Sequence, residues 1–466
     1  MTDPASSKDR STGVRSFLRK ALVPFATALF FFTGLFFLGW LSMPVGSALY
    51  YEYDLERMEE KGEDIDVFFL GSSRIFRAFV PEVYEKELGV DNCFVGGTSG
   101  QRIEDSYYML EDLCRRTQPA VVVLGVQWNT FQPTDEDGME HTLKVNERLS
   151  IAGRAGYLWR NLGTDMFPQL FDLYRRRFDF SAEQLSKNLS DRISLKESGY
   201  VRDMNKLNTY FGKGFIYANR SIEDGNIAIE KIWTNRFDPG EADPLRLKYL
   251  DRICGLCAKK GIRLILVSPP GSLMGVYSID NFQGAADFYT AYAREKGIEY
   301  HNLNYMRNRV ELFPDHLMYD GWHFSGEGAY ELSAAYGKLL KRALDGEDIS
   351  GSFYKDLDEL KETVHRVVAV GADFEQDGNE LTIRACSLHN DDVQVLYSLE
   401  LSLDGGQNYE PLSDWTEETV FHMELPDEDD SRIRLRAALS PEDEDFAWQD
   451  YEIAHLFDEK TGGEEL

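Results

Sequence analysis

Short, unbroken apolar runs alternate with longer amphipathic segments between residues 63 and 345. The apolar runs are rich in β-branched and aromatic residues, and runs without polar alternation are typical of strands that are covered on both faces of a parallel sheet. They span 65–70, 93–95, 120–126, 263–268 and 298–304. Helical segments separate them, at 81–88, 103–116, 244–260, 282–297 and 326–344. The alternation predicts an α/β three-layer sandwich with a parallel sheet and right-handed crossovers.

One long stretch, 131–243, interrupts this alternation after the third predicted strand. It is aromatic and basic, and it includes AGYLWRNLGTDMFPQLFDLYRRRF. We predict a mostly helical insertion. Because open sheets bind ligands beyond the carboxyl ends of their strands, we expect it to wall a site there. Its aromatic and basic side chains serve either helix packing or the binding of a glycan or a membrane partner.

The N-terminal region carries one long apolar stretch. No charged residue occurs from Ala21 to Tyr51, and about 20 apolar residues are enough to span a bilayer. Basic residues precede this stretch and acidic residues follow it; they are Arg10, Arg15, Arg19 and Lys20, and then Glu52, Asp54 and Glu56. The positive-inside rule therefore predicts a cytoplasmic tail over 1–20 and a single transmembrane helix over 21–43. All that follows Tyr51 would lie outside the cell membrane. A cleaved signal peptide with Gly46-Ser47-Ala48 as its cleavage site is the alternative.

The pattern changes from Val367 onward. Apolar and polar residues alternate at period two, with turn signals at Asp377-Gly378 and Asp404-Gly405-Gly406. This predicts an antiparallel β-sandwich of the immunoglobulin type over 367–458. A charged helical linker over 346–366 would connect it to the α/β domain, and we expect the sandwich to be separable there.

The charge of the chain is strongly negative and unevenly distributed. The formal net charge is −30, and residues 351–466 contain 31 Asp and Glu against 8 Lys and Arg, a net of −23. Nucleic-acid binding needs a basic surface, so this composition argues against that class of partner.

The five cysteines do not form a disulfide framework. Cys254 and Cys257 have the spacing of a redox or zinc pair, but both fall on the apolar stripe of a predicted helix, where core packing is the better interpretation. We expect neither a metal nor a cofactor.

The first predicted strand runs directly into Gly71-Ser72-Ser73-Arg74, at the carboxyl edge of the sheet. This block is either a turn or the position of a nucleophile. A serine hydroxyl needs an adjacent base that a third group orients. We expect Ser73 to be the nucleophile, with Ser72 as the alternative, and Arg74 to be a surface or partner contact.

A second block, LMYDGWHFSGEGAYELS, enters the last predicted helix. Asp320 and His323 are three residues apart there, a spacing that lets the carboxylate orient the imidazole. His316 has only the adjacent Asp315, so we interpret it as structural. Together with Ser73 these residues form a Ser…Asp…His order without the GxSxG elbow of ordinary α/β-hydrolases. The oxyanion hole would come from GGTSGQ (96–101) and GVQWNT (125–130), after the second and third strands.

These blocks resemble the SGNH, or GDSL-like, hydrolase family over about residues 63–345, and the resemblance implies the flavodoxin-like fold of that family. The resemblance implies Ser73 as nucleophile, Gly100 as the glycine of the second block, and Asp320 with His323 as the fourth block, which HFSGEGA follows as it does in the family. The third block of the family, Gly-x-Asn-Asp, is not matched by this sequence. It falls on GVQW, so that Gln127 stands where the oxyanion asparagine is expected, with Asn129 two residues later.

The apolar N-terminal stretch, the GSS spelling and the insertion look more like the membrane-anchored DltD-like and alginate-acetylation-type branches than like secreted lipases. That resemblance implies a serine esterase or O-acyltransferase that acts on acyl groups, chiefly acetyl, of a cell-surface polysaccharide or other acylated polymer. A membrane-bound O-acyltransferase would be its partner. A non-catalytic scaffold of a surface-polymer complex is the alternative function.

Overall fold

The structure is a computed structural model in which the chain forms two compact units. One unit contains residues 1–54 and 137–201, and the other contains 55–136 and 202–466. Parts of the expected insertion and of the expected sandwich lie outside the described residues. The structure describes residues 6–43, 45–132, 142, 144–169, 171–175, 181–195, 202–221, 235–390, 393–424, 431–441 and 448–452.

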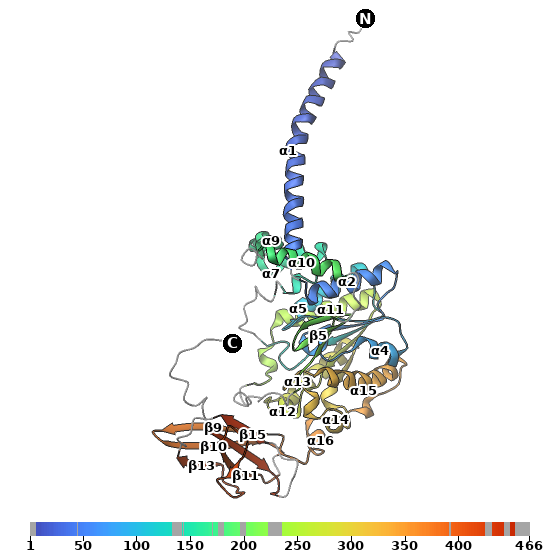
Figure 1. The fold of residues 1–466 in the computed structure, drawn as a ribbon. Helices are drawn as coiled ribbons and strands as arrows, with labels where there is room; N and C mark the ends of the chain where they lie inside the picture. Colours follow the sequence, from blue (N-terminus) through green and yellow to red (C-terminus); the bar gives the residue numbers. More distant parts are fainter. Residues whose placement is uncertain are drawn as a thin grey trace. The chain divides into compact units, whose positions relative to one another are not determined.

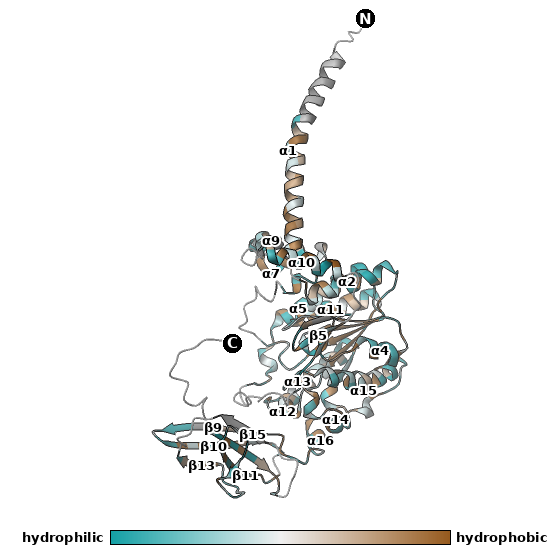
Figure 2. Ribbon diagram, viewed as in Figure 1, coloured by the Kyte–Doolittle hydropathy of each residue, from teal (hydrophilic) through white to brown (hydrophobic). Residues whose placement is uncertain are grey.

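The first unit is helical (Figure 1). Its longest helix, α1 (Ser6–Ser42), contains an apolar segment, Lys20–Ser42, with a mean hydropathy of 2.1 and no buried residue in its most apolar window. Figure 2 shows this stretch as largely hydrophobic. The expected apolar helix is therefore present, and it is long enough to cross a membrane. Shorter helices follow in the same unit: α7 (Ile151–Leu162), α8 (Met166–Gln169), α9 (Asp172–Arg175) and α10 (Ala182–Leu195).

The second unit contains the predicted parallel sheet. Its five strands run in the order β2-β1-β3-β7-β8, and every neighbouring pair is parallel. This is the doubly wound, flavodoxin-like order, so the predicted fold class is confirmed. The strands are β1 (Val67–Gly71), β2 (Cys93–Gly97), β3 (Val121–Gly125), β7 (Arg263–Ser268) and β8 (Glu299–Asn302).

Helices cover both faces of this sheet (Figure 1). On one face α5 packs against α11, and Tyr292 of α13 contacts Cys254 of α11; on the other face α4 packs against α15. Right-handed crossovers place the helices in this way, because the chain reverses direction across the sheet after β2. Five helices match the sequence prediction to within a residue: α4 (Pro81–Leu88), α5 (Ile103–Arg116), α11 (Pro244–Lys260), α13 (Phe282–Lys296) and α15 (Gly326–Leu344).

The expected mostly helical insertion also contains a small antiparallel sheet. Its strands are β4 (Arg202–Asn205), β5 (Asn208–Gly212) and β6 (Phe215–Ala218), in the order β4-β5-β6. The backbone N–H of Val95 donates to the carbonyl of Lys213 over 2.8 Å, so the β5–β6 turn lies against the edge strand β2. An edge strand with unpaired backbone groups is thereby covered.

The predicted C-terminal β-structure is confirmed as two antiparallel sheets with the orders β13-β10-β9 and β12-β11-β14-β15. Buried apolar residues of both sheets, among them Ile383 and Leu435, share one core. The strands are β9 (Ala369–Asp377), β10 (Glu380–Leu388), β11 (Leu396–Ser402), β12 (Glu410–Pro411), β13 (Val420–Glu424), β14 (Arg432–Ala438) and β15 (Trp448–Glu452).

The segment expected to be a linker helix is packed into the α/β domain. It is helical only at Ser350–Ser352 and in α16 (Leu357–Lys361). Tyr354 and Leu360 are buried in a cluster with Phe282 and Tyr305. A truncation at Asp345 would remove these buried side chains along with the sandwich, and the separability of the sandwich stays a prediction.

Candidate active site

Three glycines end the three adjacent strands at the carboxyl edge of the sheet. Gly71 is paired in register with Gly97, and Gly125 ends β3. A Cβ built on Gly71 or Gly125 would lie 2.7 or 2.5 Å from the side chain of Ile75. Ile75 belongs to the short helix α3 (Ser73–Phe76). The glycines therefore make the room that lets α3 start directly on top of the strands, with Ser73 as its first residue.

Gly97→Ala is expected to destabilise the fold by about 1–3 kcal/mol, because overpacking a close contact costs that much. The new Cβ would lie 2.6 Å from the backbone oxygen of Gly71, which cannot rotate away. Gly255→Ala in α11 is the matched control, since no atom lies within 4 Å of its new Cβ. We expect that control to be neutral or stabilised by about 0.5–1 kcal/mol. Urea unfolding measures both, and equal effects at the two positions would contradict this packing.

The structure brings Ser73 to His323, which follows it by 250 residues, and to Asp320. Ser73 Oγ lies 2.8 Å from His323 Nε2, and His323 Nδ1 lies 2.8 Å from Asp320 Oδ2 and 3.0 Å from Oδ1. In the part of the chain that the structure describes, Ser72 Oγ has no hydrogen-bond partner. An ionised carboxylate only accepts hydrogen bonds, so Nδ1–H donates to Asp320 and Nε2 is left to accept the Ser73 proton.

Asp320 is held in its charged form by its own turn. Burial alone would raise the pKa of this carboxyl, but the His323 imidazole and the backbone N–H groups of Trp322 and His323 bring it below its usual value. Those two N–H groups donate to Oδ1 over 2.7 and 2.8 Å. The turn leads into α15, where the Ser325 hydroxyl caps the helix by accepting from the Gly328 N–H. Because of the Asp-x-x-His spacing, one loop carries both the base, His323, and the group that orients it, Asp320.

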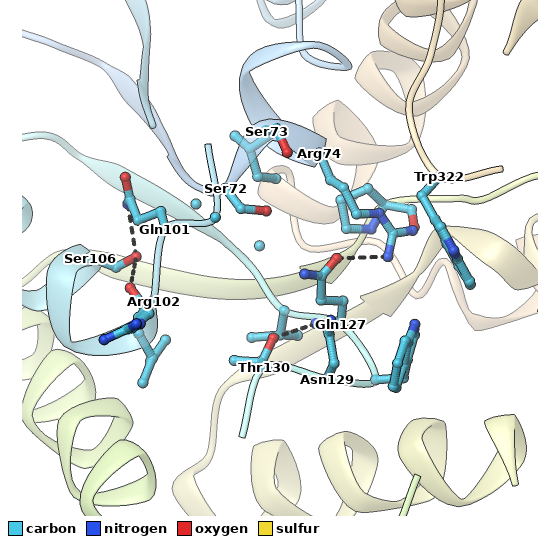
Figure 3. Close-up of a pocket in the computed structure, with 18 of the residues that line it drawn as sticks. Ser72, Ser73, Arg74, Gln101, Arg102, Ser106, Gln127, Asn129, Thr130 and Trp322 are labelled. Atoms are coloured by element: carbon cyan, nitrogen blue, oxygen red, sulfur yellow. Dashed lines mark hydrogen bonds between the residues drawn. The ribbon is translucent and has the colours of Figure 1, made fainter. Parts of the chain in front are cut away.

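A cavity of about 250 Å³ opens beside Ser73 (Figure 3), and His323 also lines it. Its walls come from the ends of β1 and β3, from the segment that follows β2 and from the loop that carries Trp322. The candidate oxyanion residues Gly100, Gln127 and Asn129 all line it. A small acyl group is of a size that such a cavity admits.

The two candidate amide side chains differ in their surroundings. Gln127 Oε1 accepts a hydrogen bond from Arg74 Nη1 over 2.9 Å, which fixes the direction of the amide (Figure 3). Gln127 Nε2 has no partner among the described residues, so it is a donor available to a ligand in the cavity. Asn129 Oδ1 is buried without a partner. Of the two side chains, Gln127 has the better-fixed donor.

Arg74 is the residue that the sequence analysis placed wrongly. We expected a surface contact, but its side chain is 6% exposed. It also donates to the carbonyl of Pro269 over 2.5 Å and lies 4.6 Å from the centre of the Trp322 ring. Burial lowers the pKa of Arg74 to about 9, while the nearby Asp320 charge opposes that shift, so the guanidinium stays charged at neutral pH. Nothing in the local pattern marks this arginine as buried.

Other sequence candidates lie away from the cavity. His316 is exposed, in a short turn over Asp315–Leu317. Cys257 is buried and Cys254 half-buried on α11, both as free thiols, which agrees with the core interpretation of that pair. Within the described residues, no group of His, Cys, Asp or Glu side chains has the arrangement of a metal site.

No family model matches this chain, and no curated protein matches it. Solved structures do show similarity, at low identity. A GDSL-like lipase from Bacteroides thetaiotaomicron is 14% identical, with coverage of 65% of this chain and 99% of that chain and a TM-score of 0.27. A lipase/acylhydrolase from Enterococcus faecalis is 13% identical, with coverage of 60% and 96% and a TM-score of 0.25.

A two-domain esterase active on acetylated mannans, co-crystallized with mannopentaose, is also similar to this chain. It is 12% identical, with coverage of 86% of this chain and 93% of that chain and a TM-score of 0.24. At these values we assign roles to residues only from the geometry of this chain.

Proposed function

We propose that this protein is an SGNH-type serine esterase or O-acyltransferase. The observation that carries the proposal is the continuous hydrogen-bonded chain from Ser73 Oγ through His323 to Asp320. This arrangement contains a nucleophile, a base within hydrogen-bond reach and a group that orients the base, as nucleophilic acyl transfer requires. A non-catalytic scaffold would have no need for that alignment.

The reaction follows from these positions. Ser73 Oγ attacks the ester carbonyl carbon while His323 Nε2 takes its proton, and Asp320 stabilises the imidazolium. Gln127 Nε2 and the backbone N–H of Gly100 are the donors we assign to the resulting oxyanion. His323 then protonates the leaving alcohol, and an acyl-Ser73 ester remains. Water or a sugar hydroxyl then gives its proton to His323 Nε2 and attacks the acyl carbon of that ester. His323 returns the proton to Ser73 Oγ as the bond to the acyl carbon breaks, so that Ser73 is free again and a carboxylic acid or a new ester is released.

We propose further that α1 anchors the protein in the cell membrane. The support is its apolar segment, Lys20–Ser42, which is uncharged from Ala21 onward, with basic residues at its start and acidic residues after it. The catalytic domain would then be extracytoplasmic. Its substrates would be acyl groups, chiefly acetyl, on a cell-surface glycan or other acylated polymer, as in the DltD-like and alginate-acetylation-type branches. A membrane-bound O-acyltransferase is the partner we propose as acyl supplier.

A fluorophosphonate probe is expected to label the protein at Ser73, because the probe reacts with serines that an adjacent base activates. Peptide mass spectrometry would locate the adduct, and p-nitrophenyl acetate turnover would report activity. Ser73→Ala should abolish both signals. Ser72→Ala is the matched control and should keep both. Labelling that persists in Ser73→Ala and disappears in Ser72→Ala would show that Ser72, and not Ser73, is the nucleophile.

The proposed orientation predicts that protease added to intact cells or spheroplasts removes the part of the chain beyond Tyr51. The basic side chains before Ala21 hold the N-terminus inside. An N-terminal and a C-terminal epitope tag would be followed by immunoblotting. The C-terminal tag should be lost and the N-terminal tag retained. Protection of the C-terminal tag would contradict the orientation, and release of an untruncated C-terminal fragment without protease would favour a cleaved signal peptide.

A further inference from the structure

The carboxyl end of α1 is held by two helices of the insertion. α9 and α10 both contact α1, and Figure 1 shows them gathered at its end. Asn188 Nδ2 donates to the carbonyl of Leu41 over 3.0 Å. Arg192 donates to the carbonyls of Trp40 and Met43 over 2.8 and 2.9 Å and lies 4.3 Å from the centre of the Trp40 ring. The free carbonyls that end a helix are thus satisfied by side chains from α10.

These contacts fall within the length of α1 that a bilayer would cover. A helix rises about 1.5 Å per residue and the hydrocarbon core is about 30 Å thick, so a span that begins at Lys20 leaves the core near Trp40. Phe36 then lies about 6 Å inside the core boundary. The Phe36 ring contacts the Phe171 ring, with 5.7 Å between centroids. The chain just before α9 therefore reaches the depth of the outermost acyl-chain carbons.

The helices around this point expose large apolar side chains. Trp159 of α7 is 56% exposed, Phe167 of α8 is 57% exposed and Ile193 of α10 is 62% exposed. α7 contacts α8, α8 contacts α9, and α9 and α10 contact α1, so the exposed side chains occur on one connected group of helices. Single exposed apolar residues are common on soluble proteins, whereas contiguous groups of them mark interaction surfaces.

α10 has the pattern of an interfacial helix. Leu189 and Ile193 are four residues apart and lie on one face, next to the face from which Asn188 and Arg192 reach α1. The opposite face is polar, with Lys187 exposed among serines and a glutamate. A helix with one charged face and one apolar face lies in the plane of a membrane interface.

We propose that α7–α10 form a platform immersed in the bilayer interface at the outer end of α1, with Trp159, Phe167, Leu189 and Ile193 in contact with lipid. This rests on the membrane anchor proposed for α1. Lipid is the occupant because α9, α10 and the adjacent Phe171 already pack on turns of α1 that lie at or inside the acyl-chain boundary. Trp159 and Trp40 are suited to this depth, since tryptophan is enriched at the headgroup level.

Photocrosslinking in the full chain tests the proposal. p-Benzoylphenylalanine would replace Ile193, Lys187 or Phe30, one position in each sample, with the protein reconstituted in phosphatidylethanolamine–phosphatidylglycerol vesicles. Phospholipid adducts would be counted by mass spectrometry. Lys187 is the matched control on the opposite face of α10, and Phe30, 82% exposed in the middle of the apolar segment, reports the anchor itself. All three are exposed on helices, so the replacements disturb no core.

We expect adducts at Phe30 and at Ile193, and at least about tenfold fewer at Lys187, because only the apolar face of an interfacial helix meets acyl chains. Adducts at Phe30 without adducts at Ile193 would overturn the platform while the anchor stands, and crosslinks from Ile193 to another protein would do the same. Equal yields at Ile193 and Lys187 would overturn the one-sided immersion. An absence of adducts at Phe30 would overturn the anchor, and the platform with it.

Discussion

His323→Ala is expected to lower kcat for ester hydrolysis by about 10⁴–10⁶-fold, because a triad works as a unit and loses most of its rate when its base is removed. His323 Nε2 is 2.8 Å from Ser73 Oγ, and no other described side chain is hydrogen-bonded to that oxygen. The imidazole is part of the cavity wall rather than of the buried core, so the fold should persist. Turnover of p-nitrophenyl acetate and the thermal unfolding temperature would be measured together.

His316→Ala is the matched control for this variant. His316 precedes His323 by seven residues, is exposed, and lies on a turn outside the cavity. We expect its activity to stay within about twofold of the parent, as for surface substitutions away from special features. Asp320→Asn should fall between the two variants, with a loss of about 10⁴-fold, because the wrong tautomer of His323 would be favoured. A folded His316→Ala protein as inactive as His323→Ala would contradict our choice of base.

Arg74→Ala is expected to lower kcat by about 10²–10³-fold, which is the loss that removal of one oxyanion donor produces. Arg74 does not reach the reacting atoms through a hydrogen bond of its own, and its assigned role is to hold Gln127 Oε1 so that Nε2 faces the cavity. Without it the Gln127 amide is free to rotate. The loss should appear mainly in kcat with little change in KM, because the oxyanion forms only after substrate has bound.

A double-mutant cycle separates positioning from a structural role. If Arg74 acts through Gln127, the double variant Arg74→Ala, Gln127→Ala should be scarcely slower than Gln127→Ala alone. Arg77→Ala is the control for loss of a nearby positive charge, since Arg77 lies one helical turn on and packs over the Tyr319 ring. Its effect should combine additively with that of Gln127→Ala. Full additivity of the Arg74 and Gln127 losses would contradict the proposed coupling.

The burial of Arg74 is unfavourable for stability in isolation, since a charged guanidinium loses its hydration. It is offset by two hydrogen bonds to Gln127 and Pro269 and by the Trp322 ring. Such a group next to the proposed nucleophile is better explained by activity than by stability, because a buried charge is seldom retained for packing. The resemblance to the SGNH family leads one to expect an asparagine where Gln127 stands, and we propose that Arg74 and Gln127 together take its role.

Local pattern alone determined the backbone of the α/β domain. Apolar periodicity can be recognised within a short stretch of sequence, and this made several elements predictable. They are the strands near Val67 and Arg263 and the helices α4, α5, α11 and α15. The order of Ser73, Asp320 and His323 was predictable as well. Parallel strands end at one edge of the sheet, so residues placed after β1 and β8 are brought to the same edge, and the Asp-x-x-His spacing supplies its own geometry.

Tertiary structure decided what depends on partners distant in sequence. The burial of Arg74 needs Gln127 from the end of β3 and Pro269 from the end of β7, which no local window contains. The sequence predicted that Tyr354 and Leu360 belong to a charged linker, but in the structure they are buried against Phe282 and Tyr305. The position of the β5–β6 turn was set by the N–H of Val95, which lies on the edge of the sheet and bonds to that turn rather than to a neighbouring strand. In each case the free energy of burial or pairing came from a surface that existed only once the sheet had formed.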